Sequence, residues 1–150
     1  MALKAQLDND IKAALLSGDR FVTETLRGLK AAVLNEEVAA GLREDGIGDE
    51  AFEKIVAREI KKRNESALTY DGADRTDLAE TERAEADILS RYLPEQVTEE
   101  VIQQTVQRIV AELGVSGPAA MGQVIGAVKK ELGNSADGAT VAKIVKDALQ

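Results

Sequence analysis

The residues whose types and spacing suggest chemistry lie near the C-terminus, between Pro118 and Leu149. Gly122 and Gly126 are separated by four positions, and Lys129 and Lys130 follow them closely. Because glycine has no side chain, such a pair allows another backbone to approach a helix closely, and lysine ammonium groups attract phosphate. These residue types favour binding, either of a nucleic-acid backbone or of a partner helix, over catalysis.

Catalytic chemistry has few candidate residues in this chain. The 150 residues include no histidine and no cysteine, which excludes Ser-His and Cys-His catalysis and thiolate zinc sites. The phosphate-binding motifs GxxxxGK[ST] and GxGxxG are also absent. Carboxylate pairs among 27 acidic residues arise by chance on amphipathic helices. We therefore predict no catalytic residue, no metal site and no cofactor.

The net charge of −8 is unevenly distributed. Residues 97–150 carry five basic and six acidic residues, so most of the negative charge belongs to residues 1–96. Repulsion of nucleic acid should therefore be weakest in the last third of the chain. No apolar run approaches the ~18 residues of a membrane span, and the first residues have no signal-peptide core. We expect a soluble cytoplasmic protein without membrane contact.

Apolar residues recur every three or four positions along most of the chain, which is the period of an amphipathic helix. The spacing predicts seven helices, at about 2–17, 20–40, 50–70, 76–92, 99–113, 118–132 and 138–149. Four residues should cap helix N-termini: Asp19, Asp49, Thr98 and Asp137. Pro94 ends the fourth helix and marks a boundary, because proline lacks an N–H donor and disfavours the helical conformation of the residue before it. We predict an all-α protein with an N-terminal four-helix domain (1–94) and a three-helix C-terminal domain (95–150).

The predicted helix 118–132 has two different faces. At ~100° per residue, the core side is formed by Met121, Val124, Ile125, Val128 and Leu132. The glycines and lysines lie roughly 130° away from that stripe. Two glycines inside a helix cost up to ~2 kcal/mol, so something should approach this backbone. A neighbouring helix of the same chain, a partner protein and a sugar-phosphate backbone all remain open.

The start of the last helix extends this candidate surface. Asp137 should accept a hydrogen bond from the Thr140 N–H, and Gly138 permits close approach beside it. Lys143 and Lys146 are predicted on the outer side of the same helix. If they lie near Lys129 and Lys130, four positive charges share one side of a nearly neutral module.

Four segments together resemble the YqeY family of small bacterial proteins. They are DRFVTETLRGLKAAVLNEE (19–37), YLPEQVTEE (92–100), AAMGQVIGAVKK (119–130) and SADGATVAKIVKDAL (135–149). The resemblance covers essentially the whole chain. The same pattern is similar to the C-terminal tail of the B subunit of tRNA-dependent amidotransferase (GatB).

The resemblance implies a link to tRNA recognition. The GatB tail helps to hold tRNA, whereas amide formation and ammonia production belong to other parts of that enzyme. We therefore expect a non-catalytic accessory protein that binds tRNA or a tRNA-associated protein, with Arg27 and Lys30 extending the surface or forming surface ion pairs. A protein-protein interaction module is the alternative. A carbon-nitrogen ligase using glutamine as amido-N-donor is the least favoured hypothesis.

Overall fold

The computed structural model describes residues 2–150, which form α-helices and two short 3₁₀ turns and no strand. The α-helices are α1 (Ala2–Ser17), α2 (Arg20–Ala39), α3 (Asp49–Gly72), α4 (Thr76–Ser90), α5 (Glu99–Leu113), α6 (Met121–Leu132) and α7 (Gly138–Leu149). The turns η1 (Pro118–Ala120) and η2 (Gly133–Ser135) flank α6. The predicted all-α class is confirmed.

The chain divides into two compact units, Met1–Leu93 and Pro94–Gln150. Each unit has a hydrophobic cluster of its own. The predicted division into an N-terminal domain (1–94) and a C-terminal domain (95–150) stays a prediction.

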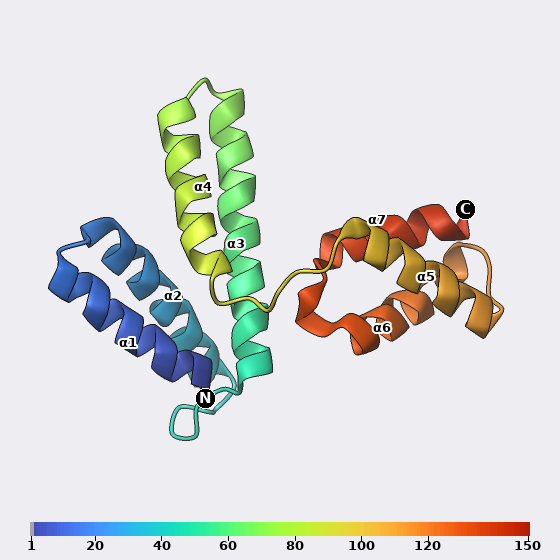
Figure 1. Ribbon diagram of the computed structural model, residues 1–150, viewed down its shortest axis with the longest axis horizontal. Helices are drawn as coiled ribbons and strands as arrows, with labels where there is room; N and C mark the ends of the chain where they lie inside the picture. The colour runs from blue at the N-terminus through green and yellow to red at the C-terminus, as the bar shows by residue number, and fades with distance from the viewer. Residues whose placement is uncertain (1) are drawn as a thin grey trace. The chain divides into compact units, whose positions relative to one another are not determined.

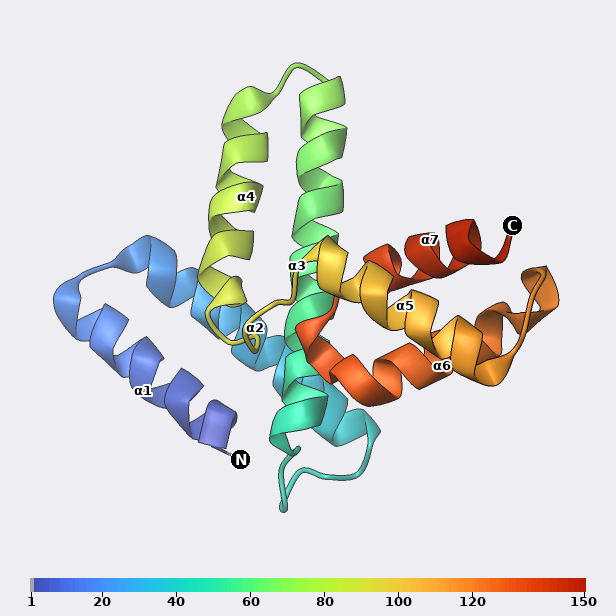
Figure 2. The same cartoon turned by 45° about the vertical axis from the view of Figure 1, so that its right-hand side comes forward.

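The N-terminal unit consists of two helical hairpins. α1 lies antiparallel beside α2, and α3 lies antiparallel beside α4 (Figures 1 and 2). Their shared core is aliphatic apart from Phe52 and Tyr92, whose ring centroids lie 6.1 Å apart. Tyr92 is buried, and its hydroxyl donates a hydrogen bond of 2.5 Å to Asp10 on α1. This contact ties the segment after α4 to the first helix.

Helix capping follows the sequence prediction at three of four positions. The side chains of Asp19, Thr98 and Asp137 each accept a hydrogen bond from a backbone N–H in the first turn of the following helix. The prediction for Asp49 is wrong, because Gly48 occupies the N-cap of α3. The Asp49 carboxylate instead accepts a hydrogen bond of 3.0 Å from the backbone N–H of Leu3. A tertiary contact with α1 has taken the place of the local cap.

The C-terminal unit is a bundle of three helices around a small aliphatic core. The fully or nearly fully buried residues are Ile102, Val106, Ile109, Val124, Val128, Val141, Val145 and Leu149. Arg108 on α5 forms ion pairs with Glu112 on the same helix and with Glu131 on α6. The segment before α5 is held to η2, since Val97 N–H donates to the Ser135 carbonyl at 2.8 Å.

Candidate binding surface on helix α6

Helix α6 has one face in the core and one face in solvent. Val124 and Val128 are completely buried, and Met121, Ile125 and Leu132 pack against the same cluster from its margin. The pattern is that of an amphipathic helix whose apolar stripe seals a three-helix bundle. The other side of α6 therefore contributes little to the stability of the unit.

Gly122 and Gly126 lie on the exposed side of α6, with nothing from the rest of the C-terminal unit against them. A Cβ atom built at either position would meet no heavy atom within 4 Å beyond the adjacent residues and the helix's own backbone. A neighbouring helix of this unit therefore does not explain these glycines. Their smooth backbone remains available for close approach by another molecule.

Two lysines border the glycines at the C-terminal end of α6. Lys129 and Lys130 are exposed, and neither forms an ion pair with any residue from 2 to 150. Glu131, the adjacent acid, is already paired with Arg108 on α5. The two ammonium groups are therefore unneutralised beside an open backbone, which is the arrangement that a phosphate group or a partner's carboxylate could use.

Asp137 and Gly138 mark the start of α7. The Asp137 carboxylate accepts hydrogen bonds from the Thr140 N–H at 3.0 Å and from the Thr140 hydroxyl at 2.8 Å. Asp137 is thus occupied in capping the helix, while Gly138 is exposed with open space beside it. Asp137 therefore contributes to a binding surface by orienting α7.

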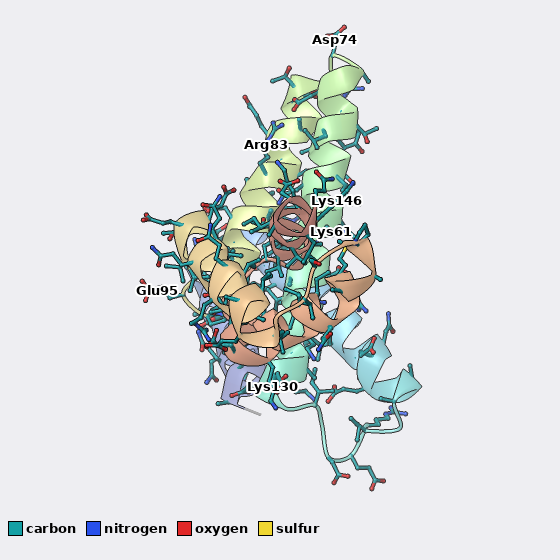
Figure 3. The ribbon with its side chains drawn as sticks, turned by 90° about the vertical axis from the view of Figure 1, so that its right-hand side faces the viewer. Lys61, Asp74, Arg83, Glu95, Lys130 and Lys146 are labelled. Atoms are coloured by element: carbon teal, nitrogen blue, oxygen red, sulfur yellow. The ribbon has the colours of Figure 1, made fainter. Side chains whose placement is uncertain are left out.

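Lys130 on α6 and Lys146 on α7 do not share one compact patch (Figure 3). Lys143 and Lys146 are exposed, without an ion pair among the described residues. Figure 3 shows Lys130 on α6 and Lys146 on α7 at opposite sides of the C-terminal unit. In a three-helix bundle the outer faces of two helices diverge, so lysines that are outermost on each of them separate. The α6 residues are therefore the more coherent candidate site.

Arg27 and Lys30 belong to α2 in the N-terminal unit. Lys30 Nζ lies 2.7 Å from Asp8 Oδ1 on α1, so the ion-pair interpretation is confirmed for this residue. Arg27 is exposed and has no ion pair with any described residue.

Among residues 2–150 no group of three or more Asp and Glu side chains could hold a metal ion. The pKa of Tyr92 is raised by burial and by its hydrogen bond to Asp10, but this hydroxyl lies within the N-terminal unit's packing and serves to join two segments.

No single described helix is both long and apolar enough to cross a membrane. Only when Glu99–Leu113 and Pro118–Ser135 are taken together is a described stretch long and apolar enough to span a membrane, and these two segments are bent by 105° to each other.

Comparison with known proteins identifies the family. The family model described as Yqey-like protein matches residues 4–149. The chain belongs to the YqeY family. Its curated relatives include proteins named Altered inheritance of mitochondria protein 41, mitochondrial. The relative from Lachancea thermotolerans is 29% identical over 76% of this chain and 61% of its own length. The Kluyveromyces lactis protein is 31% identical over 76% of this chain and 62% of its own length. The Pyrenophora tritici-repentis protein is 27% identical over 96% of this chain and 79% of its own length.

This chain spans less than two thirds of the length of the Lachancea thermotolerans and Kluyveromyces lactis relatives. The relatives' names place those proteins in mitochondria, and the organisms are fungi. A bacterial origin and a cytoplasmic location for this YqeY-family chain stay predictions.

Sequence patterns missed two features of the N-terminal unit. The first is a buried ion pair between Lys4 and Glu37, which no local rule indicates because the partners are distant in the chain. The second is a row of exposed aliphatic residues on α2, including Leu34 and Val38. Their spacing of four residues is visible in the sequence, but the stronger stripe of Leu26, Leu29 and Val33 obscures it.

Proposed function

We propose that this protein is a non-catalytic accessory protein that binds tRNA through the exposed side of α6. The contact surface consists of Gly122, Gly126, Lys129 and Lys130, with Gly138 and the start of α7 beside it. The observation that carries the proposal is the combination of open space at both glycines with two unneutralised lysines. The similarity to the GatB tail supports tRNA as the nucleic acid.

A sugar-phosphate backbone would reach α6 at its two glycines. Without Cβ atoms at the two glycines, a phosphate group can come nearer to the α6 backbone than at any alanine-lined helix. The lysines then act as point charges that position the backbone without reading base sequence. The near balance of charge in residues 97–150 keeps repulsion low on this unit.

Binding of tRNA by wild type and by Lys129→Glu/Lys130→Glu, measured over a series of salt concentrations, tests the proposal. We expect the variant to bind at least about tenfold more weakly. Its slope of log affinity against log salt should be smaller by about 1.4–1.8, as for two lost phosphate contacts. The matched control is Lys61→Glu/Arg91→Glu, which changes the net charge equally but reverses two exposed cationic residues of the N-terminal unit that pair with no residue from 2 to 150. Equal losses in both variants would show that only net charge matters and would refute the site.

The same glycines would also suit a partner helix, and one substitution separates the two functions. Gly126→Leu places a large side chain on the open face and should block either ligand. If a protein partner captured by wild type is lost in Gly126→Leu but kept, independent of salt, in the double lysine reversal, α6 is a protein-interaction surface and the tRNA proposal fails.

A further inference from the structure

The α1–α2 hairpin carries an exposed face that neither the core nor the α6 surface uses. On α2, Arg27, Ala31, Leu34 and Val38 recur at spacings of four, three and four residues, which places them on one side of the helix. Leu34 is 47% exposed and Val38 is 57% exposed. The core lies on another side of α2, where Leu29 is completely buried.

Two ion pairs define how α1 borders this face. Lys4 Nζ lies 2.8 Å from Glu37 Oε2, and Lys30 Nζ lies 2.7 Å from Asp8 Oδ1. The two helices therefore run antiparallel, as Figures 1 and 2 show. Lys12 follows Asp8 by one turn of α1, so it lies level with Arg27, the first of the four residues on this side of α2.

The charges of this face do not balance. Arg27 and Lys12 are exposed, and neither pairs with any residue from 2 to 150. The bordering acids are already neutralised: Asp8 pairs with Lys30, and Glu24 pairs with the arginine four residues before it. In a chain whose net charge is −8, this is a locally positive surface with aliphatic side chains beside it.

The dimensions suit a short helix. We define the α1–α2 face as Lys12, Leu15, Arg27, Ala31, Leu34 and Val38; Leu15 on α1 is 56% exposed. From Arg27 to Val38 the row extends about 16 Å, the length of three turns of α-helix. A single exposed leucine needs no explanation, but large aliphatic residues aligned along a hairpin mark an interaction surface.

We propose that the α1–α2 face binds an amphipathic helix of a partner protein whose apolar stripe is flanked by aspartate and glutamate. The aliphatic side chains would receive the apolar stripe, as in helix-in-groove recognition. The acidic flanks would pair with Arg27 and Lys12, which selects against basic helices. No residue of α6 takes part, so this site and tRNA binding can fail separately.

The probe is a fluorescein-labelled helical peptide with leucines at i, i+4, i+7 and i+11 and glutamates on both flanks. A second peptide has lysines in place of the glutamates. Fluorescence anisotropy with the full chain should show binding of the acidic peptide and at least about tenfold weaker binding of the basic one. Equal affinity for both peptides, or no binding of either, would overturn the proposal.

Two variants and a matched control locate the site. Leu34→Gln/Val38→Gln should weaken binding of the acidic peptide by about tenfold or more. Lys12→Glu/Arg27→Glu should reverse the preference, so that the basic peptide binds more tightly. The control, Lys61→Gln/Leu68→Gln, removes an exposed lysine and an exposed leucine from α3 and should bind like wild type. Circular dichroism detects a variant that has unfolded. Lys12→Glu/Arg27→Glu changes only exposed charges, so it tests the site without any apolar substitution.

A second copy of this chain is the competing occupant. Analytical ultracentrifugation of wild type and of Leu34→Gln/Val38→Gln at the same concentration distinguishes it. A wild-type dimer that this variant converts to a monomer would overturn the proposal, whereas a monomer in both cases agrees with a separate acidic partner.

Discussion

Replacing Lys4 by methionine should destabilise the N-terminal unit by about 2–3 kcal/mol. The Glu37 side chain is completely buried, and both of its oxygens accept hydrogen bonds of 2.8 Å from Lys4 Nζ. One oxygen also accepts from the Ile47 N–H at 3.1 Å. Methionine retains most of the aliphatic volume but removes the charge, so a buried carboxylate is left with a single backbone donor.

The size of this effect follows from the exposure of the two partners. Breaking a fully buried pair costs about 3–5 kcal/mol. Because the Lys4 side chain is 31% exposed, water can partly replace the ammonium group, so the expected loss of about 2–3 kcal/mol falls below the range for a fully buried pair. The corresponding shift in the urea midpoint is about 1–2 M.

The chain's composition provides a specific assay. Both tyrosines, Tyr70 and Tyr92, belong to the N-terminal unit, and there is no tryptophan. Tyrosine fluorescence during urea unfolding therefore reports the N-terminal unit alone, whereas far-UV circular dichroism reports both units. The fluorescence midpoint should decrease in Lys4→Met.

The control is Lys54→Met, which removes a lysine whose pair with Glu50 is largely exposed, at 68% and 82%. Such a pair contributes about 0–1 kcal/mol. In the double variant Lys4→Met/Glu37→Gln, a neutral amide replaces the carboxylate and should restore part of the loss, because it can still accept from the Ile47 N–H. If Lys4→Met shifts the midpoint no more than Lys54→Met does, the buried pair is not what holds α1 against α2.

Three further predictions concern single side chains. Burial and Asp10 raise the pKa of Tyr92, so the unfolded state loses its proton first and the stability of the N-terminal unit should fall as pH rises above about 10. Tyr92→Phe should cost about 1 kcal/mol at neutral pH and show a smaller fall in alkali, measured by urea unfolding; an identical pH profile would contradict this. Gly126→Ala should stabilise α6 by about 0.5–1 kcal/mol, since the added Cβ meets open space, whereas Gly114→Ala should destabilise the unit by about 1 kcal/mol because its φ is +63°. Thermal unfolding followed by circular dichroism compares the two, and destabilisation by Gly126→Ala would reveal a neighbour at that position. Asp137→Ala should cost about 1 kcal/mol in the same measurement, because α7 loses its N-cap; an unchanged midpoint would argue against the cap.

Local patterns account for much of the candidate site. The register of α6 follows from Val124 and Val128, and it correctly places Gly122 and Gly126 on the opposite, exposed side. The capping role of Asp137 is likewise confirmed. Each of these features depends on residues within one or two helical turns, where spacing and hydrogen-bond chemistry determine the geometry.

Features that depend on pairs of helices were not predictable in the same way. Helical spacing places Lys130 and Lys146 each on an outer face, but only the packing of α6 against α7 separates them within the unit. Asp49 has the right residue type for an N-cap, yet its carboxylate bonds to the Leu3 N–H because α1 begins beside it. The sequence pattern gives the direction of a side chain from its own helix axis and not the direction of the neighbouring axis.

The sequence by itself determined the all-α class, the limits of most helices, the aliphatic cores and the membership of the YqeY family. It also excluded histidine and cysteine chemistry by composition alone. Only the tertiary structure decided that no helix of the C-terminal unit covers Gly126, that Lys4 neutralises a buried Glu37, and that Leu34 lies exposed beside an unpaired Arg27. Periodicity is a property of one helix, whereas exposure and pairing depend on contacts between residues that are far apart in the chain.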